Sequence, residues 1–448
     1  MSSEEFDALV IGGGPAGYWA SLIASIRGLK VVLVEEGRVG GTCLNYGCVP
    51  LVTSMNYLST VDLIRKLSSE GSGIFVKDLE VDIGKVFEYV EKNVTTPISE
   101  GMRKTLEDLD VRIISGRATL INERTAKVGD KVIGFKRAVI ASGLSWKSLE
   151  GALPCVEFTR IREKPSKVLV VGGNPFGLSI ASLFSMLGCE VLVVEGSTNV
   201  LEGFDTEVSE YLLMMLREKN IEVMLNTKVV KVVLSGDGKK VRLSTPEGEL
   251  HLSVDVVFDA VSYSPRLDSL GGVKVDLEKG YIRVDERLRT SVGNIYAAGD
   301  VTGTSQYANV AIVQGIVAGE NISGNDLRIN LKLLPRYLFT YPEAFSVGLT
   351  ESEARKAGYV VSVARQSLAS NPILRSVGSA GMVKVVVDAN YGGILGVQAV
   401  GHGITELINE GILMVALEST CGSIINTYLA HPTVGEVLRD SLIQVYRP

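Results

Sequence analysis

The sequence FDALVIGGGPAG, residues 6–17, decides the fold of the first part of this 448-residue chain. Its apolar beginning predicts a short buried β-strand, and the glycines that follow predict a tight turn. The run from Pro15 to about Arg27 predicts a helix, and residues 31–34 predict a second strand that ends at Glu35. We therefore expect a β-α-β motif with its turn at the glycines.

Three glycines of this motif have distinct physical roles. Gly12 allows the tight turn, Gly14 lets backbone N–H groups approach a pyrophosphate, and Gly17 lets the helix pack closely on the strand. Glu35 follows Gly12 by 23 positions, where a carboxylate suits ribose hydroxyls. Because these residues occur in the order strand, turn, helix, strand and acid, they predict a dinucleotide-binding site.

The same pattern recurs in residues 168–195. An apolar strand leads into GGNPFG at 172–177, a helix reaches about Leu187, and a further strand ends at Glu195, again 23 positions after Gly172. Two such motifs in the same orientation leave three interpretations open. Both bind a dinucleotide, one binds a dinucleotide while the other is vestigial, or the second is only a duplicated scaffold.

The pattern changes near residue 325. Beyond it, valine-rich runs at 359–363, 382–387 and 394–400 predict strands, and residues 404–417 predict an amphipathic helix. The expected fold class is α/β, with two Rossmann-like dinucleotide-binding domains and a C-terminal α+β domain.

The composition excludes several classes of protein. A hydrophobic content of 46% with 21% charged residues is typical of a globular chain, and a net charge of −6 leaves no basic field for nucleic acid. No apolar run approaches the ~20 residues that cross a membrane, and the acidic N-terminus lacks the basic region of a signal peptide. We expect a cytoplasmic protein with small-molecule or protein partners, and neither nucleic acid nor membrane among them.

Two of the five cysteines lie close together, in GGTCLNYGCVPLVTS at 40–54. The spacing of Cys43 and Cys48 matches no common zinc pattern and is wider than the CxxC of small redox domains. In a reducing compartment a close pair is more often catalytic than structural. We expect a redox-active pair and no metal site.

One of the three histidines is a candidate general base. Thiol-disulfide exchange needs a thiolate, and a nearby imidazole that takes the proton produces one at neutral pH. His251 is expected in a polar turn region and His402 in a Gly-His-Gly loop. A lone histidine is more often structural, but His431 precedes Pro432 and has Glu436 five residues later, which makes it the best candidate.

The order of these motifs resembles the FAD-dependent pyridine nucleotide-disulfide oxidoreductases. After the first motif and the cysteine pair come the second motif, NIYAAGD at 294–300 and HPTVGE at 431–436. Within that family FTYPE at 339–343, VGLT at 347–350 and AHPT at 430–433 are similar to the dihydrolipoamide dehydrogenase subgroup. The resemblance covers essentially the whole chain.

The resemblance implies an FAD-binding domain in two parts (1–148 and 265–330), an NAD(P)-type Rossmann domain (149–264) and a C-terminal domain (331–448) through which the protein forms a homodimer. The residues implied to bind FAD are Gly12, Gly14, Pro15, Ala16, Gly17, Glu35, Gly41, Thr42, Ala141, Ser142, Gly143, Gly299 and Asp300.

The resemblance also implies an activity and catalytic roles. Cys43 would exchange with substrate, Cys48 would face the flavin, and His431 of the other subunit would act as acid/base, oriented by Glu436. The implied reaction oxidises dihydrolipoamide, on a lipoyl-bearing protein or a small dithiol, through a Cys43–Cys48 disulfide and FAD. Alternatives are a reductase of another disulfide on the same scaffold and an idle FAD-binding paralogue that serves as a subunit.

The nicotinamide side departs from that family. Val52 stands where relatives keep a lysine near the flavin, and Ser179 where they keep its glutamate partner. The loss of both the lysine and its glutamate partner is physically consistent, because removing only one of them would leave the other charge buried and unpaired at a cost of roughly several kcal/mol. Asn174 replaces the central glycine of the second motif, where a side chain intrudes on a pyrophosphate, although Glu195 is retained.

Three further residues bear on the same question. Pro175 biases Asn174 towards extended conformations and away from the left-handed region, and Ser262 and Arg266 replace a glycine and an asparagine of a later family motif. Together the departures argue against efficient use of NAD. The acceptor is therefore left open between NAD and another, such as a ferredoxin, a quinone or a dye, and the sequence defines neither the dithiol nor a parent complex.

Overall fold

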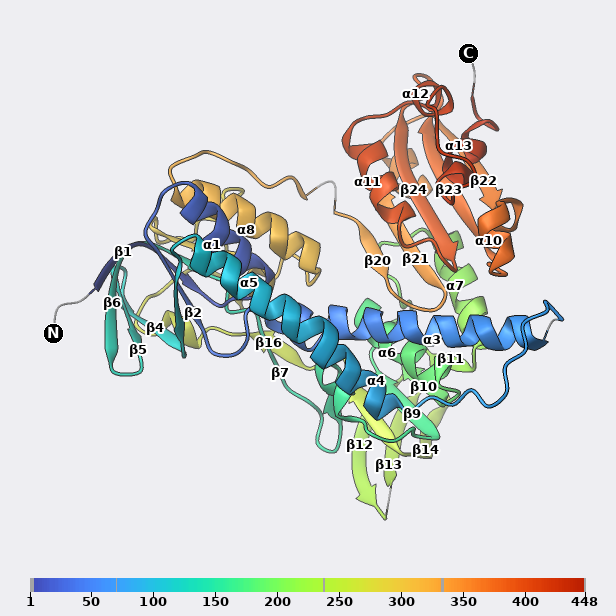
Figure 1. Ribbon diagram of the computed structural model, residues 1–448, viewed down its shortest axis with the longest axis horizontal. Coiled ribbons are helices and arrows are strands. Elements are labelled where there is room, and N and C mark those ends of the chain that lie inside the picture. The colour runs from blue at the N-terminus through green and yellow to red at the C-terminus, as the bar shows by residue number, and fades with distance from the viewer. Residues whose placement is uncertain (1–3, 70, 237, 332–333, 447–448) are drawn as a thin grey trace. The chain divides into compact units, whose positions relative to one another are not determined.

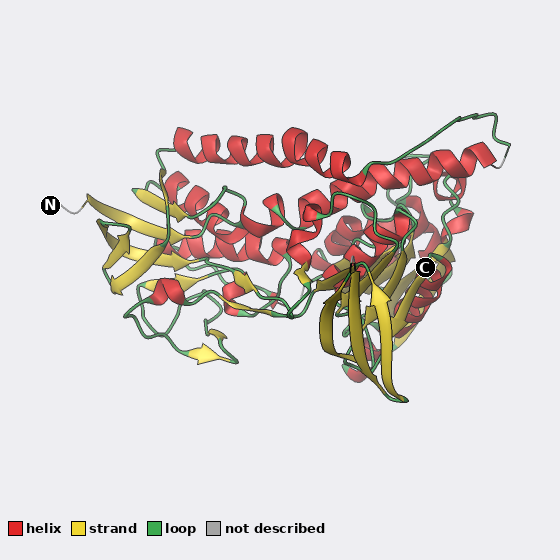
Figure 2. Cartoon of the chain, turned by 90° about the horizontal axis from the view of Figure 1, so that it is seen from below, coloured by secondary structure: helices red, strands yellow, loops and turns green. Residues whose placement is uncertain are grey.

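The chain divides into two compact units in the computed structural model, which describes residues 4–69, 71–236, 238–331 and 334–446 (Figure 1). The first unit comprises 1–53, 84–147 and 262–330, and the second comprises 54–83, 148–261 and 331–448. Each unit combines helices with β-sheets, and the predicted α/β class is confirmed (Figure 2).

The first unit is built on a sheet with the strand order β3-β2-β1-β6-β5-β4, and β19 also pairs with β6. The apolar run of the opening motif forms its centre because both faces of β1 are buried. Ala8 and Val10 enter one core cluster, whereas Leu9 and Ile11 enter the other. The strands are β1 (Glu4–Ile11), β2 (Val31–Glu35), β3 (Arg112–Ser115), β4 (Ala118–Asn122), β5 (Thr125–Val128), β6 (Lys131–Ile140) and β19 (Ile295–Ala297).

Helices α1 and α8 lie side by side in this unit (Figure 1). The sequence predicted α1, but it did not predict the long helix α3, which begins at Cys48. Pro50 lies in the first turn of α3, where a proline removes no helical hydrogen bond. The helices are α1 (Pro15–Ile26), α2 (Gly41–Asn45), α3 (Cys48–Ser69, which continues into the second unit), α4 (Ile83–Val90), the π-helical η1 (Glu91–Thr95), α5 (Thr96–Asp108) and α8 (Ala308–Ile322).

Short elements complete the first unit. The strand β7 (Leu144–Trp146) pairs with β16 (Tyr263–Pro265), and β17 (Leu277–Glu278) pairs with β18 (Tyr281–Ile282). The 3₁₀ turns are η3 (Asp268–Leu270) and η4 (Asp300–Thr302).

The second unit contains a parallel sheet with the order β11-β10-β9-β15-β8 and an antiparallel sheet β12-β13-β14. His251 lies in β14, exposed, and not in the turn region that the sequence predicted. The elements are β8 (Leu153–Pro154), η2 (Cys155–Arg160), β9 (Lys167–Val171), α6 (Pro175–Met186), β10 (Glu190–Val194), α7 (Thr206–Glu218), β11 (Ile221–Met224), β12 (Lys228–Ser235), β13 (Gly238–Thr245), β14 (Gly248–Val254) and β15 (Val256–Asp259).

The C-terminal part of this unit is an antiparallel sheet with the order β20-β21-β24-β23-β22, packed with α11 and α13. The elements are β20 (Arg336–Leu338), β21 (Glu343–Gly348), α9 (Glu351–Lys356), β22 (Val361–Ser367), η6 (Leu368–Ser370), α10 (Pro372–Ser376), β23 (Gly381–Asp388), β24 (Ile394–Gly401), α11 (Leu407–Ala416), α12 (Cys421–Ile425) and α13 (Glu436–Leu442). Among the described residues, no helix is long and apolar enough to cross a membrane.

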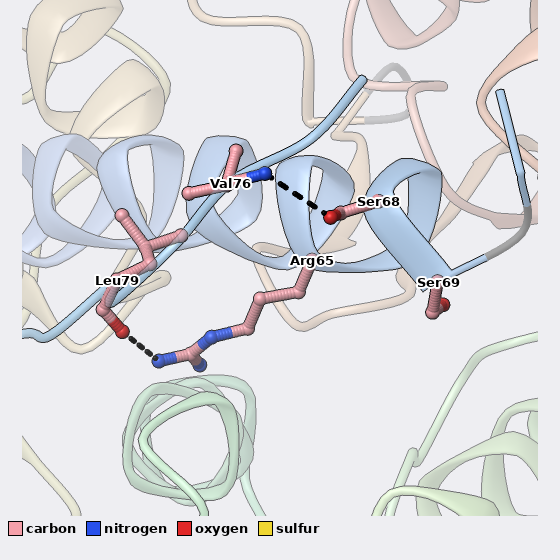
Figure 3. A pocket seen from close by; sticks show the side chains of 5 residues that line it. All are labelled: Arg65, Ser68, Ser69, Val76 and Leu79. Atoms are coloured by element: carbon pink, nitrogen blue, oxygen red, sulfur yellow. Dashed lines mark hydrogen bonds between the residues drawn. The ribbon is translucent and has the colours of Figure 1, made fainter. Parts of the chain in front are cut away.

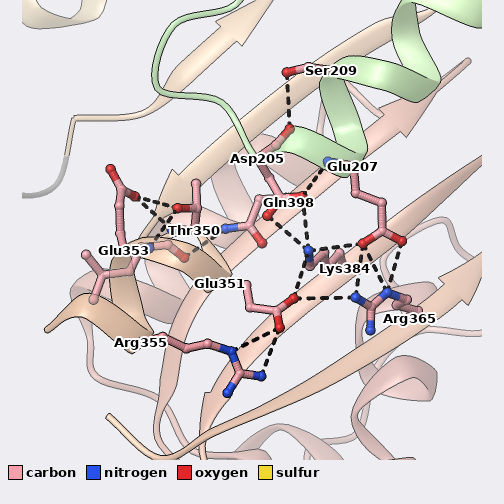
Figure 4. Close-up of polar contacts among 11 residues, drawn as sticks. Asp205, Glu207, Ser209, Thr350, Glu351, Glu353, Arg355, Arg365, Lys384 and Gln398 are labelled. Carbon is pink, nitrogen blue, oxygen red and sulfur yellow. Dashed lines mark hydrogen bonds and ion pairs between the residues drawn. The ribbon is translucent and has the colours of Figure 1, made fainter. Parts of the chain in front are cut away.

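Side chains on β23 alternate between the two faces of this sheet. Val383 and Val385 enter the apolar core, whereas Lys384 meets acidic residues at the start of α7 and on α9 (Figure 4). We call Lys384, Asp205, Glu207, Glu351 and Arg365 the Lys384 cluster. It joins the Rossmann part of the second unit to the C-terminal sheet.

Candidate active site

The turn between β1 and α1 can be built only with glycine. Gly12 has a φ of +100°, and a Cβ on it would lie 2.3 Å from the carbonyl oxygen of Ala141. A Cβ on Gly17 would lie 1.7 Å from the carbonyl oxygen of Gly12. The carboxylate of Glu35 accepts hydrogen bonds from the backbone N–H groups of Gly13 and Gly37. The turn and the acid are therefore fixed together.

Two loops of the first unit lie against this turn. Gly41, the first residue of α2 before Thr42, approaches so closely that a Cβ would lie 2.6 Å from the Cα of Gly14. The chain after β6 passes next to Gly12 at Ala141. The hydroxyl of Ser142 then donates to the carbonyl oxygen of Arg266 at 2.7 Å.

A largely buried carboxyl group lies at the end of the NIYAAGD stretch, residues 294–300, in the same unit. Gly299 precedes Asp300, and its N–H donates to the side chain of Gln314 at 2.6 Å. Burial raises the pKa of Asp300 to about 6. Gln314 is 1% exposed, and sequence reasoning missed it, although a single amide within the apolar run of α8 was a usable signal.

These residues fit an FAD molecule. The glycine turn opens onto the N-terminus of α1, where backbone N–H groups attract a phosphate. Glu35 is placed for a ribose. The largely buried Asp300 lacks the hydration that a free carboxylate has, so a flavin's hydroxyl groups are suitable partners. Ala16 lies beside Gly299, since a Cβ on Gly299 would be 3.1 Å from that of Ala16.

The Gly17→Ala variant is expected to lose at least about tenfold in FAD affinity, because the new methyl group would collide with a backbone carbonyl that cannot rotate away. The flavin content of the purified protein, from its absorption spectrum, measures the loss. Gly101→Ala is the matched control, because Gly101 lies in α5 with open space around its Cβ position. Full flavin content in Gly17→Ala would contradict the expectation.

Cys43 lies in α2 and Cys48 begins α3, and both are free thiols. The pKa of Cys48 is lowered, first by a hydrogen bond from Cys43 and then by the backbone N–H at the start of α3. The pKa of Cys43 is raised, because it donates that hydrogen bond and is buried. The two thiols are therefore unequal, and Cys48 loses its proton more readily than Cys43.

His431 and Glu436 form a dyad in the second unit. The Nδ1 atom of His431 lies 3.1 Å from each carboxylate oxygen of Glu436. The backbone N–H of Thr433 and the imidazole, in that order, lower the pKa of Glu436. The Glu436 side chain is 6% exposed, while that of His431 is 75% exposed. The other ring nitrogen is therefore available to a molecule outside this chain.

The residues of the nicotinamide side lie in both units. Val52 is in the first unit, in α3. In the second unit, Glu195 accepts hydrogen bonds from the N–H groups of Gly173, at 2.7 Å, and Ser197, at 2.8 Å. Ser179, 4% exposed, donates to the carbonyl oxygen of Pro175 one turn earlier. The uncharged Ser179 side chain thus finds its hydrogen-bond acceptor within α6.

Two of the residues that depart from the family pattern have well-defined surroundings. Arg266 lies in the first unit, where it pairs with Glu36 and its N–H donates to the carbonyl oxygen of Gly143. Asn174 is extended, as predicted, with φ −72° and ψ 168°, but Gly14 has nearly the same backbone, φ −67° and ψ −175°. This position does not require a left-handed backbone conformation. The difference between the two turns therefore lies in the side chain of Asn174 and not in its backbone.

Two further features of the described chain concern metal binding and a pocket beside α3. No group of three or more histidine, cysteine or acidic residues in the described ranges could hold a metal ion. A shallow pocket of about 300 Å³ beside α3 is lined by Arg65, Ser68, Ser69, Val76 and Leu79. Arg65 donates to the carbonyl oxygen of Leu79, and Ser68 accepts from the N–H of Val76 (Figure 3). The charged group that lines the pocket is therefore itself hydrogen-bonded within the chain.

Comparison with known proteins supports the same assignment. The family described as pyridine nucleotide-disulphide oxidoreductase matches residues 6–315, and the dimerisation domain of that family matches residues 334–442. A dihydrolipoyl dehydrogenase of Thermus scotoductus is 34% identical over 97% of this chain and 96% of its own length. One of Chlorobaculum tepidum is 32% identical over 98% and 96%.

The fold itself has solved counterparts. LpdA from Mycobacterium tuberculosis has a TM-score of 0.88 at 24% identity, over 98% of this chain and 100% of its own. The flavoprotein disulfide reductase RclA from Escherichia coli has a TM-score of 0.84 at 24% identity, over 98% and 100%. With the glycine cradle and cysteine pair described above, these matches show that the chain belongs to the pyridine nucleotide-disulphide oxidoreductase family and is an FAD-dependent enzyme.

Proposed function

We propose that this protein oxidises a dithiol, such as the dihydrolipoyl group of a partner protein or a small dithiol, through Cys43 and Cys48. The observation that carries the proposal is the unequal thiol pair, with the pKa of Cys48 lowered and that of Cys43 raised, in the same unit as the FAD cradle. The relatives named dihydrolipoyl dehydrogenase support the choice of dithiol.

The unequal pair sets the direction of exchange. In the oxidised protein one thiolate of the substrate attacks the sulfur of Cys43, which breaks the Cys43–Cys48 bond and releases Cys48 as a thiolate. The second substrate thiol then attacks the substrate sulfur of the mixed disulfide, which releases the cyclic disulfide and leaves Cys43 to take a proton. A bound FAD would supply a two-electron acceptor for the resulting Cys43–Cys48 dithiol.

His431 supplies the proton chemistry in this proposal. Its imidazole takes a proton from the substrate thiol, while Glu436, held ionised by Thr433, keeps the ring oriented. Because the His431 ring is largely exposed on its own chain, we propose that it serves the cysteine pair of a partner subunit in a homodimer. The match to a dimerisation domain over residues 334–442 supports that arrangement.

Anaerobic addition of dihydrolipoamide to the FAD-loaded protein tests the proposal. We expect the flavin absorption to bleach within the time of a stopped-flow experiment, and a monothiol at equal thiol concentration to act far more slowly. An unchanged flavin spectrum would refute the proposal and favour an idle flavoprotein. Reoxidation of the bleached protein with NAD, NADP, a quinone or a dye then identifies the acceptor.

The His431→Gln variant is expected to slow flavin reduction by the dithiol about 100-fold at neutral pH, because glutamine keeps the size but cannot accept the proton. The rate should recover in part as the pH rises, since the substrate thiol then ionises by itself. His251→Gln is the control, because His251 is exposed on β14. A wild-type rate and pH profile in His431→Gln would exclude it as the base.

A further inference from the structure

The chain contains two copies of the same dinucleotide turn, so that one can be compared with the other. Gly12 and Gly172 have φ angles of +100° and +106°. A Cβ on Gly17 or Gly177 would collide with the carbonyl oxygen of the first glycine of its own turn, at 1.7 Å and 2.1 Å. The backbone of the second turn therefore has the same geometry as the first turn, whose residues fit FAD.

The carboxylates at the strand ends also correspond. Glu35 accepts a hydrogen bond from the N–H of Gly13, and Glu195 accepts one from the N–H of Gly173. Each carboxylate also accepts from the N–H two residues after itself. The part of the second turn that would meet the ribose of an adenosine is thus retained.

The difference lies at the N-terminus of the helix that follows. Gly14 gives α1 no side-chain cap. Asn174 caps α6, because its Oδ1 atom accepts from the N–H of Gly177 at 2.9 Å. Its Nδ2 atom donates to the carbonyl oxygen of Ala260 at 2.8 Å. The amide is therefore bonded at both ends, to the helix and to the chain after β15.

The Asn174 side-chain amide accepts a hydrogen bond from a backbone N–H that a bound phosphate would otherwise use. A pyrophosphate at such a turn is held by backbone N–H groups of the first helical turn, and one of those groups already has a partner within the chain. A phosphate would have to displace Oδ1 and leave both the Nδ2 group and the Ala260 carbonyl to find other partners.

We propose that Asn174 excludes the pyrophosphate of NAD(H) from the second dinucleotide motif, which keeps recognition of a nucleoside ribose through Glu195. Only the functional consequence of this inference rests on the proposed function: the flavin would pass its electrons to an acceptor other than a dinucleotide. It follows that adding a pyrophosphate to an adenosine ligand brings no gain in affinity.

Calorimetric titration of the FAD-loaded protein with adenosine, ADP-ribose and NADH tests this inference, since FAD fills the first motif. In the wild type we expect ADP-ribose to bind no more tightly than adenosine. In Asn174→Gly we expect ADP-ribose and NADH to bind about tenfold more tightly than in the wild type, with adenosine unchanged within about twofold. Asn174→Ala, which loses the amide but keeps Cβ, should recover part of the gain.

Asn371→Gly is the matched control, because Asn371 caps α10 in the same unit through the N–H groups of Ile373 and Leu374. It should leave all three affinities unchanged. Equal NADH affinity in wild type and Asn174→Gly would overturn the inference. If Asn174→Gly does not fold, ADP-ribose binding the wild type tenfold more tightly than adenosine would overturn it. Flavin bleaching by dihydrolipoamide is measured separately, so a failure of the dithiol reaction is not confused with either result.

Discussion

The Cys43→Ser variant is expected to lose reduction of its flavin by dihydrolipoamide by a factor on the order of 10³ or more, with FAD still bound. Serine cannot form the disulfide that the substrate attacks, and the neighbouring Cys48 then has no exchange partner. Cys48→Ser should fail equally, because the pair acts as one unit. Stopped-flow absorption of the flavin measures both.

Cys189→Ser is the control for these variants. Its thiol is buried in the second unit, donates to the carbonyl oxygen of Pro165 at 3.0 Å, and has a pKa raised to about 11 by burial. A serine hydroxyl can make the same hydrogen bond, so the rate should remain that of the wild type. Rapid bleaching in Cys43→Ser would show that the dithiol reduces the flavin without this pair.

The Lys384→Met variant is expected to lower the free energy of unfolding by about 3–5 kcal/mol, because it leaves the buried carboxylate of Asp205 without its cation. The Lys384 side chain is 4% exposed and lies 3.0–3.1 Å from oxygens of Asp205, Glu207 and Glu351. Methionine is similar in length, so packing is largely kept. Chemical denaturation measures the difference, and Lys356→Met, at the exposed end of α9, should change stability little.

The pH dependence of the Lys384 cluster has a definite sign. Arg365 and then Lys384 lower the pKa of Glu207, and Arg355 and then Lys384 lower that of Glu351. Burial opposes the charge on Lys384, but the carboxylates outweigh it and raise its pKa. The carboxylates therefore add stability above their unfolded pKa of about 4.3, lost as the pH falls, and the lysine adds stability below about 10.4, lost as the pH rises.

The stability gap between wild type and Lys384→Met should therefore be largest between about pH 5 and pH 10, and it should shrink below about pH 4. Denaturation at several pH values tests this. A gap that did not vary with pH would assign the loss to packing and not to charge. Lys384 would then stabilise the contact between α7 and the C-terminal sheet by packing and not by electrostatic attraction.

A lone polar residue within an apolar run was a signal that sequence reasoning passed over twice. Gln314 in α8 holds the turn before Asp300, and Lys384 in β23 anchors the start of α7. Burying such a side chain is costly unless it finds a hydrogen-bond or ion-pair partner in the folded protein. In both cases that partner is distant in the sequence. Such residues can be marked from sequence, but their partners cannot.

The local pattern was sufficient where the chemistry is local. The glycine turns, the acids at the strand ends, the cysteine pair and the His431–Glu436 dyad each lie within a few residues or within one β-α-β motif, whose geometry the chain's own sterics impose. The family resemblance and the use of FAD, both read from these motifs, are confirmed.

Tertiary structure decided whatever depends on contacts between distant segments. It paired Arg266 with Glu36, 230 residues earlier in the chain, and it shifted the pKa values of two cysteines that look alike in sequence in opposite directions. It also showed that Asn174 is not a strained replacement for glycine. The backbone there is extended in both turns, and the difference is an amide bonded to Gly177 and Ala260, which a sequence pattern cannot show because hydrogen bonds depend on positions in space.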